Sequence, residues 1–135
     1  MDTKYFAKEF IQIFPDSAPA YHSHLADYGE ILGHVFFGDV INQPLSQLLY
    51  ENTDKALIGK YINFIESMYA SDNSDVQNIV DVTILAYLGD DDTVLKHAFN
   101  YFSEDLMTAS KKTETGYGRR NIIISYRRGK VYARW

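Results

Sequence analysis

Apolar side chains recur every three or four residues through the middle of the chain, and this spacing constrains the fold more than any other feature. Two stretches carry it, one after Asp54 and one after Ser74. The apolar face of the first consists of Leu57, Ile58, Tyr61, Ile62, Ile65, Met68 and Tyr69. That of the second consists of Val76, Ile79, Val80, Thr83, Ile84, Tyr87 and Leu88. An α-helix has 3.6 residues per turn, so each stretch is predicted to form an amphipathic helix that buries one face.

Residues suited to helix ends flank both stretches. Asp54 is predicted to cap the first helix, because its carboxylate can accept a bond from a free amide of the first turn. Residues 74–77 (Ser-Asp-Val-Gln) fit a capping box, in which the serine hydroxyl and the glutamine amide satisfy each other's backbone groups. Gly89 is placed to end the second helix. Asp91 or Asp92 is then predicted to cap a third helix.

Most of the remaining chain up to about residue 112 is also predicted to be helical. Further helices are expected over Thr3–Phe14, over the run from Glu30 to Ile41 (EILGHVFFGDVI), over Leu45–Glu51 and from 94 to about 112, while Asp16–Ser23 is expected to be a loop. Serine 103 either starts a new helix or lies within a continuing one. Gly33 and Gly38 each cost about 1 kcal/mol inside a helix, and close approach of a neighbouring helix would explain them.

The C-terminal segment, from Gly118 to Trp135, differs in kind from the helical body at about 3–112. Ile122–Tyr126 and Val131–Trp135 are rich in β-branched and aromatic residues, and Gly129 marks a turn between them. These features predict a β-hairpin. We therefore expect a single mainly α domain over residues 1–135, either an antiparallel helical bundle or HEAT-like stacked helices, with a C-terminal β-hairpin.

Charge is divided unevenly along the chain. Residues 1–110 carry five lysines against 17 acidic residues, a net charge of −12, and residues 111–135 carry eight basic residues against one glutamate, a net charge of +7. All the arginines lie in the tail, as Arg119, Arg120, Arg127, Arg128 and Arg134. This division predicts that the tail docks on the acidic body or that the chain offers two surfaces to different partners. The acidic body disfavours nucleic acid as a partner, because phosphate contacts need clustered lysine and arginine.

Several function classes find little support in the sequence. There is no cysteine, no GxSxG motif and no P-loop, so we do not expect an enzyme or a cofactor. The N-terminus does not resemble a signal peptide and no apolar run is long enough for a membrane span, which makes a cytoplasmic location the expectation and a membrane partner unexpected.

Two histidine groups allow more than one interpretation. His22 and His24, with Asp27, are interpreted as part of a polar loop rather than as metal ligands, because their spacing matches no strong metal motif. His34 and Asp39 are expected to form a buried hydrogen bond that organises the core.

The run Asp90-Asp91-Asp92 is interpreted as helix capping, which leaves its exposed charge available to a cationic surface.

Two motifs resemble those of a known group of proteins. The stretch Glu30–Asp39 (EILGHVFFGD), followed by Leu85–Asp91 (LAYLGDD), is similar to small acidic helical bacterial proteins of the immunity type, which belong to polymorphic toxin and contact-dependent growth inhibition systems. The similarity spans about residues 25–112 and leaves the basic tail outside.

The resemblance implies an antitoxin that binds a cognate toxin domain, a basic nuclease in our prediction, and covers its substrate cleft with an acidic surface. The candidate contact residues are Asp72, Asp75, Asp90, Asp91, Asp92, Glu104 and Asp105, with exposed tyrosines as anchors. The arginine tail either braces the helices or adds a second contact, and its hairpin edge offers a route to a homodimer. The alternatives are an interaction module with another partner, or a protein that contacts RNA or depends on a metal.

Overall fold

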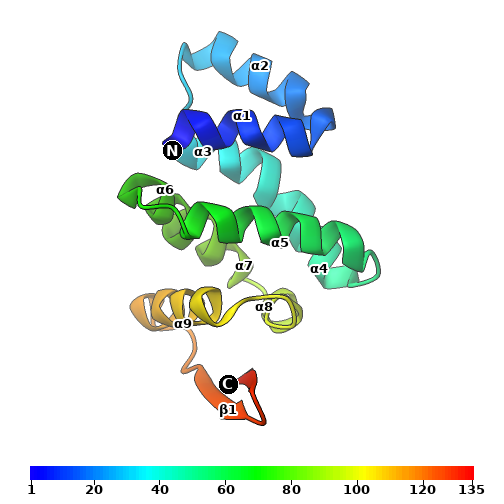
Figure 1. The fold of residues 1–135 in the computed structure, drawn as a ribbon, viewed down its shortest axis with the longest axis vertical. Coiled ribbons are helices and arrows are strands. Elements are labelled where there is room, and N and C mark those ends of the chain that lie inside the picture. The colour runs from blue at the N-terminus through cyan, green and yellow to red at the C-terminus, as the bar shows by residue number, and fades with distance from the viewer.

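The computed structural model describes all residues from 1 to 135 and shows a stack of helices closed at one end by a β-hairpin (Figure 1). The first half contains α1 (Thr3–Ile13), α2 (Ala18–Tyr28), α3 (Gly33–Phe37), α4 (Gln43–Glu51) and α5 (Lys55–Tyr69). The second half contains α6 (Ser74–Ile79), α7 (Ala86–Leu88), α8 (Asp92–Ala98), α9 (Glu104–Tyr117), β1 (Ile123–Arg127) and β2 (Lys130–Arg134). The prediction of a mainly helical chain with a C-terminal hairpin is confirmed.

The N-terminal layer differs from the prediction at one point. Asp2 caps α1 by accepting a hydrogen bond from the Tyr5 amide at 2.9 Å. The expected loop over 16–23 is wrong, because α2 begins at Ala18 after a short 3₁₀ turn. Pro19 lies in the first turn of α2. Proline is tolerated there because the first amides of a helix have no partner within it.

Two segments of the stack run side by side in the same direction. Residues 33–51 pass from α3 through the π-helical turn η2 (Gly38–Asn42) into α4, and residues 74–88 pass from α6 through η3 (Val80–Leu85) into α7. The Asn42 side chain donates to the Thr83 carbonyl at 3.3 Å. The sequence predicted separate helices before and after Pro44, whereas the structure carries the helix through the π-helical turn.

Glycine 33 allows these two segments to approach. A Cβ at Gly33 would collide with the side chains of Ile79 and Thr3, which confirms the prediction of close helix approach there. A Cβ at Gly38 would meet Thr83 only at an ordinary contact distance of 3.6 Å.

The helix caps follow the sequence in most places. Asp54 accepts from the Leu57 amide at 3.1 Å, as predicted. The capping box is wrong: Asn73 caps α6, and Gln77 donates instead to the carbonyls of Tyr69 and Ser71. An asparagine one position earlier can accept from two amides at once, and this leaves Gln77 free to close the preceding turn.

The last helices also have clear caps. Asp91 accepts from the Val94 amide at the start of α8, and the Ser103 hydroxyl accepts from the Leu106 amide at the start of α9. Ser103 therefore starts a new helix. That helix extends to Tyr117, beyond the predicted end near 112, and Gly118 ends it in the left-handed region at φ 66°.

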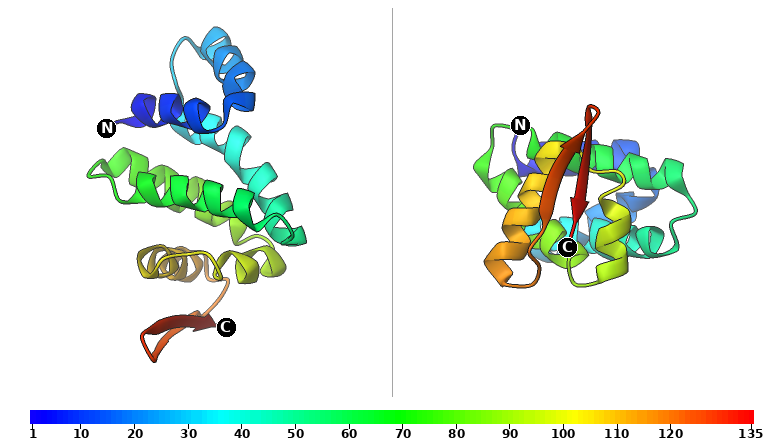
Figure 2. Two further views of the ribbon diagram at one scale, coloured as in Figure 1. Left: turned by 45° about the vertical axis from the view of Figure 1, so that its right-hand side comes forward. Right: turned by 90° about the horizontal axis from the view of Figure 1, so that it is seen from below.

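The hairpin packs across the end of the stack formed by α8 and α9 (Figure 2). Its two-residue turn has Arg128 and Gly129 at positive φ, as a type I′ turn requires. Ile122 is buried, and the Trp135 ring lies 5.3 Å from that of Phe99. Because an isolated two-stranded hairpin is marginal in water, these contacts account for its stability.

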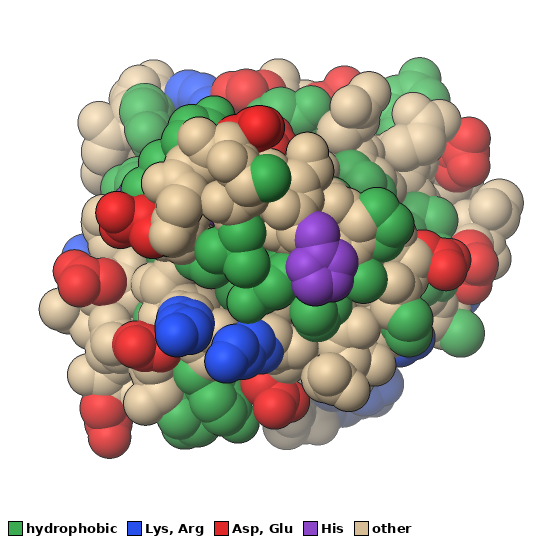
Figure 3. All heavy atoms as spheres, turned by 90° about the horizontal axis from the view of Figure 1, so that it is seen from above, with side chains coloured by type: hydrophobic (Ala, Val, Ile, Leu, Met, Phe, Trp, Pro, Cys, Tyr) green, Lys and Arg blue, Asp and Glu red, His purple; other side chains and the backbone are tan.

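One hydrophobic cluster runs through the whole stack, from Phe6 in α1 to Ile122 beside the hairpin. At the opposite end, seen in Figure 3, hydrophobic atoms lie around a histidine side chain, with acidic side chains toward the rim. None of the helices is long and apolar enough to cross a membrane.

Candidate partner-binding site

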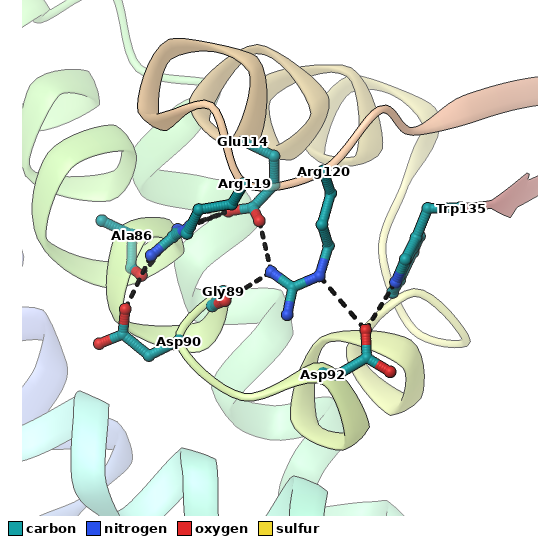
Figure 4. Close-up of polar contacts among 8 residues, drawn as sticks. All are labelled: Ala86, Gly89, Asp90, Asp92, Glu114, Arg119, Arg120 and Trp135. Atoms are coloured by element: carbon teal, nitrogen blue, oxygen red, sulfur yellow. Dashed lines mark hydrogen bonds and ion pairs between the residues drawn. The ribbon is translucent and has the colours of Figure 1, made fainter.

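The tail is anchored by one buried carboxylate. The side chain of Glu114 in α9 is only 1% exposed, and it accepts hydrogen bonds from both Arg119 and Arg120 (Figure 4). Arg119 Nε lies 3.1 Å from one carboxylate oxygen, and Arg120 Nη1 lies 2.5 Å from the other. Gly118, in its left-handed conformation, turns the chain so that both arginines lie over α9. Guanidinium groups suit this role because they present several donors in a fixed plane.

Each of these two arginines also reaches the α7–α8 turn. Arg119 donates to Asp90 Oδ1 at 2.7 Å and to the Ala86 carbonyl at 3.1 Å. Arg120 donates to the Gly89 carbonyl at 2.6 Å and to Asp92 Oδ1 at 3.3 Å. The two carbonyls lie at the C-terminal end of α7, where backbone acceptors lack partners within the helix. The arginines therefore fasten the tail to two helices at once.

Asp92 joins the end of the chain to this cluster. It accepts from Trp135 Nε1 at 2.7 Å and pairs with Lys96 at 3.1 Å. The hydrogen bond from Trp135, followed by that from Lys96, lowers the pKa of the Asp92 carboxyl below its usual value of 3.8. Because Trp135 is the protein's single tryptophan, its fluorescence reports directly on the docking of the hairpin.

Acid is expected to release Trp135 from Asp92. Since the folded-state pKa of Asp92 is depressed, the contact contributes stability above the unfolded-state pKa and loses it as pH falls through the folded value. We expect the Trp135 emission to shift toward longer wavelengths below about pH 4, before helical circular dichroism is lost. Asp92→Asn should show the shifted emission already at neutral pH. Emission in both proteins that changes only with global unfolding would contradict this assignment.

The absence of a side chain at Gly89 leaves room for the buried Glu114 carboxylate that holds the tail. A Cβ at this position would collide with the Glu114 carboxylate and with Arg119. The backbone of Gly89 is right-handed, at φ −74°, so the expected cost of Gly89→Ala is steric, about 2 kcal/mol of unfolding free energy. Gly59→Ala is the matched control, because nothing lies within 4 Å of a Cβ there. Chemical denaturation of both variants measures the difference, and equal stability would contradict the steric role.

The other three arginines have a different environment. Arg127, Arg128 and Arg134 are exposed on the hairpin and form no ion pair. The hairpin makes one further polar contact with the body, in which the Tyr126 hydroxyl donates to Glu104 at 2.6 Å. Thus the tail arginines divide into two that hold the tail to the body and three that face solvent.

The acidic residues predicted as one contact surface lie at three different turns of the fold. Asp72 and Asp75 lie at the α5–α6 turn, where Asp75 lines a groove with residues of α1 and α2. Asp90 and Asp92 are engaged by the tail, and Asp91 caps α8. Glu104 and Asp105 occupy the first turn of α9. These seven residues are therefore distributed over three turns of the fold, and two of them are already paired with the tail.

A different surface joins exposed tyrosines with a carboxylate. Tyr50 from α4 and Tyr87 from α7 line one groove of about 360 Å³ together with Asp91. Their side chains are 58% and 39% exposed. We call this surface the tyrosine–aspartate face and define it by the exposed residues that line this groove: Gln43, Gln47, Tyr50, Tyr87 and Asp91. It contains one carboxylate and no lysine or arginine.

The sequence predicts exposed tyrosines as binding anchors but does not identify which of the tyrosines are exposed. One sequence pattern indicates this surface: polar or aromatic residues occur at helical spacing opposite the apolar face, at positions 39, 43, 47 and 50. The π-helical turns interrupt this spacing, and only the fold shows that the two segments present their outer sides together.

The histidines correct two expectations. His34 is exposed and bonds Thr83 Oγ1 at 2.6 Å, so the expected buried His34–Asp39 hydrogen bond is wrong. His22 and His24 lie in helix α2, where His24 is buried and its Nε2 accepts from the Leu32 amide at 2.9 Å. No group of three or more metal-ligating side chains is arranged to hold an ion.

Comparison with known proteins gives one match. A family model described as a domain of unknown function (DUF7674) matches residues 7–118. No curated protein and no solved structure matches the chain. The matched span includes the anchor residue Glu114 and the whole tyrosine–aspartate face, and it ends at Gly118, the residue that ends α9, before the hairpin begins.

Proposed function

This chain belongs to the DUF7674 family, and from that premise we propose that it is a bacterial protein-binding domain of the immunity type, which neutralises a cognate toxin domain by occupying its cationic cleft. The observation that carries the proposal is the tyrosine–aspartate face, where Tyr50, Tyr87 and Asp91 share one groove. Tyrosine is enriched among residues that dominate binding energy, because its ring buries a large area and its hydroxyl keeps a polar contact.

The negative charge of the helical body favours a cationic partner. The helical body is strongly acidic, and the tail neutralises Asp90 and Asp92 but leaves Asp39 and Asp91 without an ion pair. An acidic surface approaches a basic cleft faster than diffusion alone allows, and complementary charge then fixes the orientation. A nuclease, whose cleft is built to hold phosphate, is the partner that this chemistry fits best.

The two motifs that resemble immunity proteins support the same surface. EILGHVFFGD forms α3 and the start of η2, and LAYLGDD forms the end of η3, α7 and the turn before α8. Both therefore belong to the two parallel segments that carry the tyrosine–aspartate face. On this proposal the protein acts in the cytoplasm, where an incoming toxin domain meets its substrate.

A pull-down from the native organism tests the proposal. Tagged protein should capture one stoichiometric partner with a basic domain, identified by mass spectrometry. Expression of that domain alone should stop growth of a host, and co-expression of this chain should restore it. A captured partner that is harmless when expressed would contradict the immunity role and favour an interaction module with another purpose.

A further inference from the structure

We propose that the outward face of the hairpin binds the phosphate backbone of a single-stranded nucleic acid. In an antiparallel ladder, residues directly opposite each other point to the same side. The pairs Ile123↔Arg134, Ser125↔Tyr132 and Arg127↔Lys130 therefore share one face, and the pairs Ile124↔Ala133 and Tyr126↔Val131 share the other. We call the first set, together with Arg128 in the turn, the outer hairpin face.

Burial identifies this face as the one that points away from the body. Lys130, Tyr132 and Arg134 are exposed, whereas Val131 and Ala133 between them are half-buried and pack against the hydrophobic cluster. The hairpin lies at the free end of the stack, beyond α8 and α9 (Figure 2), and the exposure of these residues places the outer hairpin face on its solvent side.

The cations on this face have no carboxylate partner. Arg127, Arg128, Lys130 and Arg134 form no ion pair, in contrast to Arg119 and Arg120, which pair with Glu114, Asp90 and Asp92. The hairpin therefore carries four uncompensated positive charges in a protein of net charge −5. Such a cluster attracts a polyanion, and each bound phosphate releases condensed counterions.

An exposed ring among these charges selects the kind of polyanion. Tyr132 is 47% exposed, and the Arg127 guanidinium lies 5.9 Å from the centre of its ring. Tyr132, Ser125 and the three arginines line a groove of about 390 Å³. Single-stranded nucleic acids are held by positive grooves with aromatic side chains on which bases stack. A duplex keeps its bases stacked inside, and an acidic protein surface would use the guanidinium groups but not the ring.

This site is independent of the proposed function. It lies outside the residues matched by the family model and uses none of the tyrosine–aspartate face. The hairpin can bind a single-stranded nucleic acid whether or not the body binds a toxin. The two proposals are therefore tested by separate measurements.

Fluorescence anisotropy with a labelled 12-nucleotide single-stranded RNA tests the inference. We expect binding at 50 mM salt, with a slope of log K against log salt near −3, about 0.7 for each of four phosphate contacts. Replacing Arg127, Arg128 and Arg134 together with glutamine should weaken binding by about tenfold or more and reduce the slope to about −1. Tyr132→Leu should weaken binding by about fivefold and leave the slope unchanged.

A matched variant controls for net charge. Replacing Lys4, Lys8 and Lys55 with glutamine removes the same charge from exposed, unpaired positions of the helical body, and it should leave RNA affinity nearly unchanged. Both triple variants should keep the wild-type melting temperature, since no substituted residue forms an ion pair. Equal loss of affinity in the two triple variants, no binding by the wild type, or preference for a duplex or for anionic vesicles over the single strand would each overturn the proposal.

Discussion

Glu114→Gln is expected to lower the unfolding free energy by about 3 kcal/mol, because removing one partner of a buried ion pair leaves the others buried without compensation. Here one carboxylate neutralises two arginines whose side chains are 25% and 14% exposed. A glutamine would present an amide N–H₂ to one of the guanidinium groups, and two donors cannot bond each other. Asp90 and Asp92 would retain part of the attraction, which keeps the expected loss at the lower end of the range for buried pairs.

Urea unfolding followed by circular dichroism measures this loss. Asp90→Asn is the matched control, since Asp90 pairs with Arg119 but its side chain is 67% exposed. An exposed pair contributes less than about 1 kcal/mol. Trp135 emission should shift in Glu114→Gln, because the tail is no longer fastened to α9. A loss in Glu114→Gln no larger than that in Asp90→Asn would mean that Glu114 is not the anchor.

The double substitution Tyr50→Ala and Tyr87→Ala is expected to weaken binding of the captured toxin domain by about 100-fold or more. This corresponds to about 3 kcal/mol, which is the range for residues that dominate an interface. Folding should change little, because both tyrosines are exposed and neither forms a side-chain hydrogen bond within the protein. The effect should appear mostly in the dissociation rate.

Isothermal titration calorimetry with the purified partner gives the affinity, and Tyr28→Ala is the matched control. Tyr28 is 51% exposed in α2, in a different layer of the stack from Tyr50 and Tyr87. If Tyr28→Ala weakened binding as much as the double variant, the partner would contact the N-terminal layer and the tyrosine–aspartate face would be the wrong surface.

The helices were predictable from local sequence, because apolar spacing and caps are local properties. The spacing after Asp54 and the caps at Asp54 and Asp91 were read correctly for this reason. The hairpin was predicted equally well, since β-branched residues flank a turn that tolerates positive φ at Gly129.

Errors arose where one residue type serves two structures. Proline is common both in loops and in the first turn of a helix, so the start of α2 at Ala18, beside Pro19, was not predicted. His34 and Asp39 are close in sequence and were expected to bond in the core, but both point to solvent and His34 bonds Thr83 on the neighbouring segment.

The candidate site could be predicted only in part. The uneven charge indicated either docking of the tail on the body or two surfaces for different partners. It gave no sign that Arg119 and Arg120 would bind Glu114 while the other arginines form no ion pair. That division depends on Gly118, whose left-handed conformation reverses the chain, and on Gly89, whose missing side chain makes room for the carboxylate. The tyrosine–aspartate face required two segments from distant parts of the sequence to lie side by side, which no local pattern reveals.

Hydrogen exchange of this chain with and without its captured partner tests the central claim most directly. The account predicts slower exchange on binding in α4 and across η3, α7 and the start of α8, the elements that present Tyr50, Tyr87 and Asp91. The hairpin and α2 should exchange at the same rate in the free and bound protein. Protection confined to the hairpin or to α2, with α4 and α7 unchanged, would contradict the claim that the tyrosine–aspartate face binds the partner.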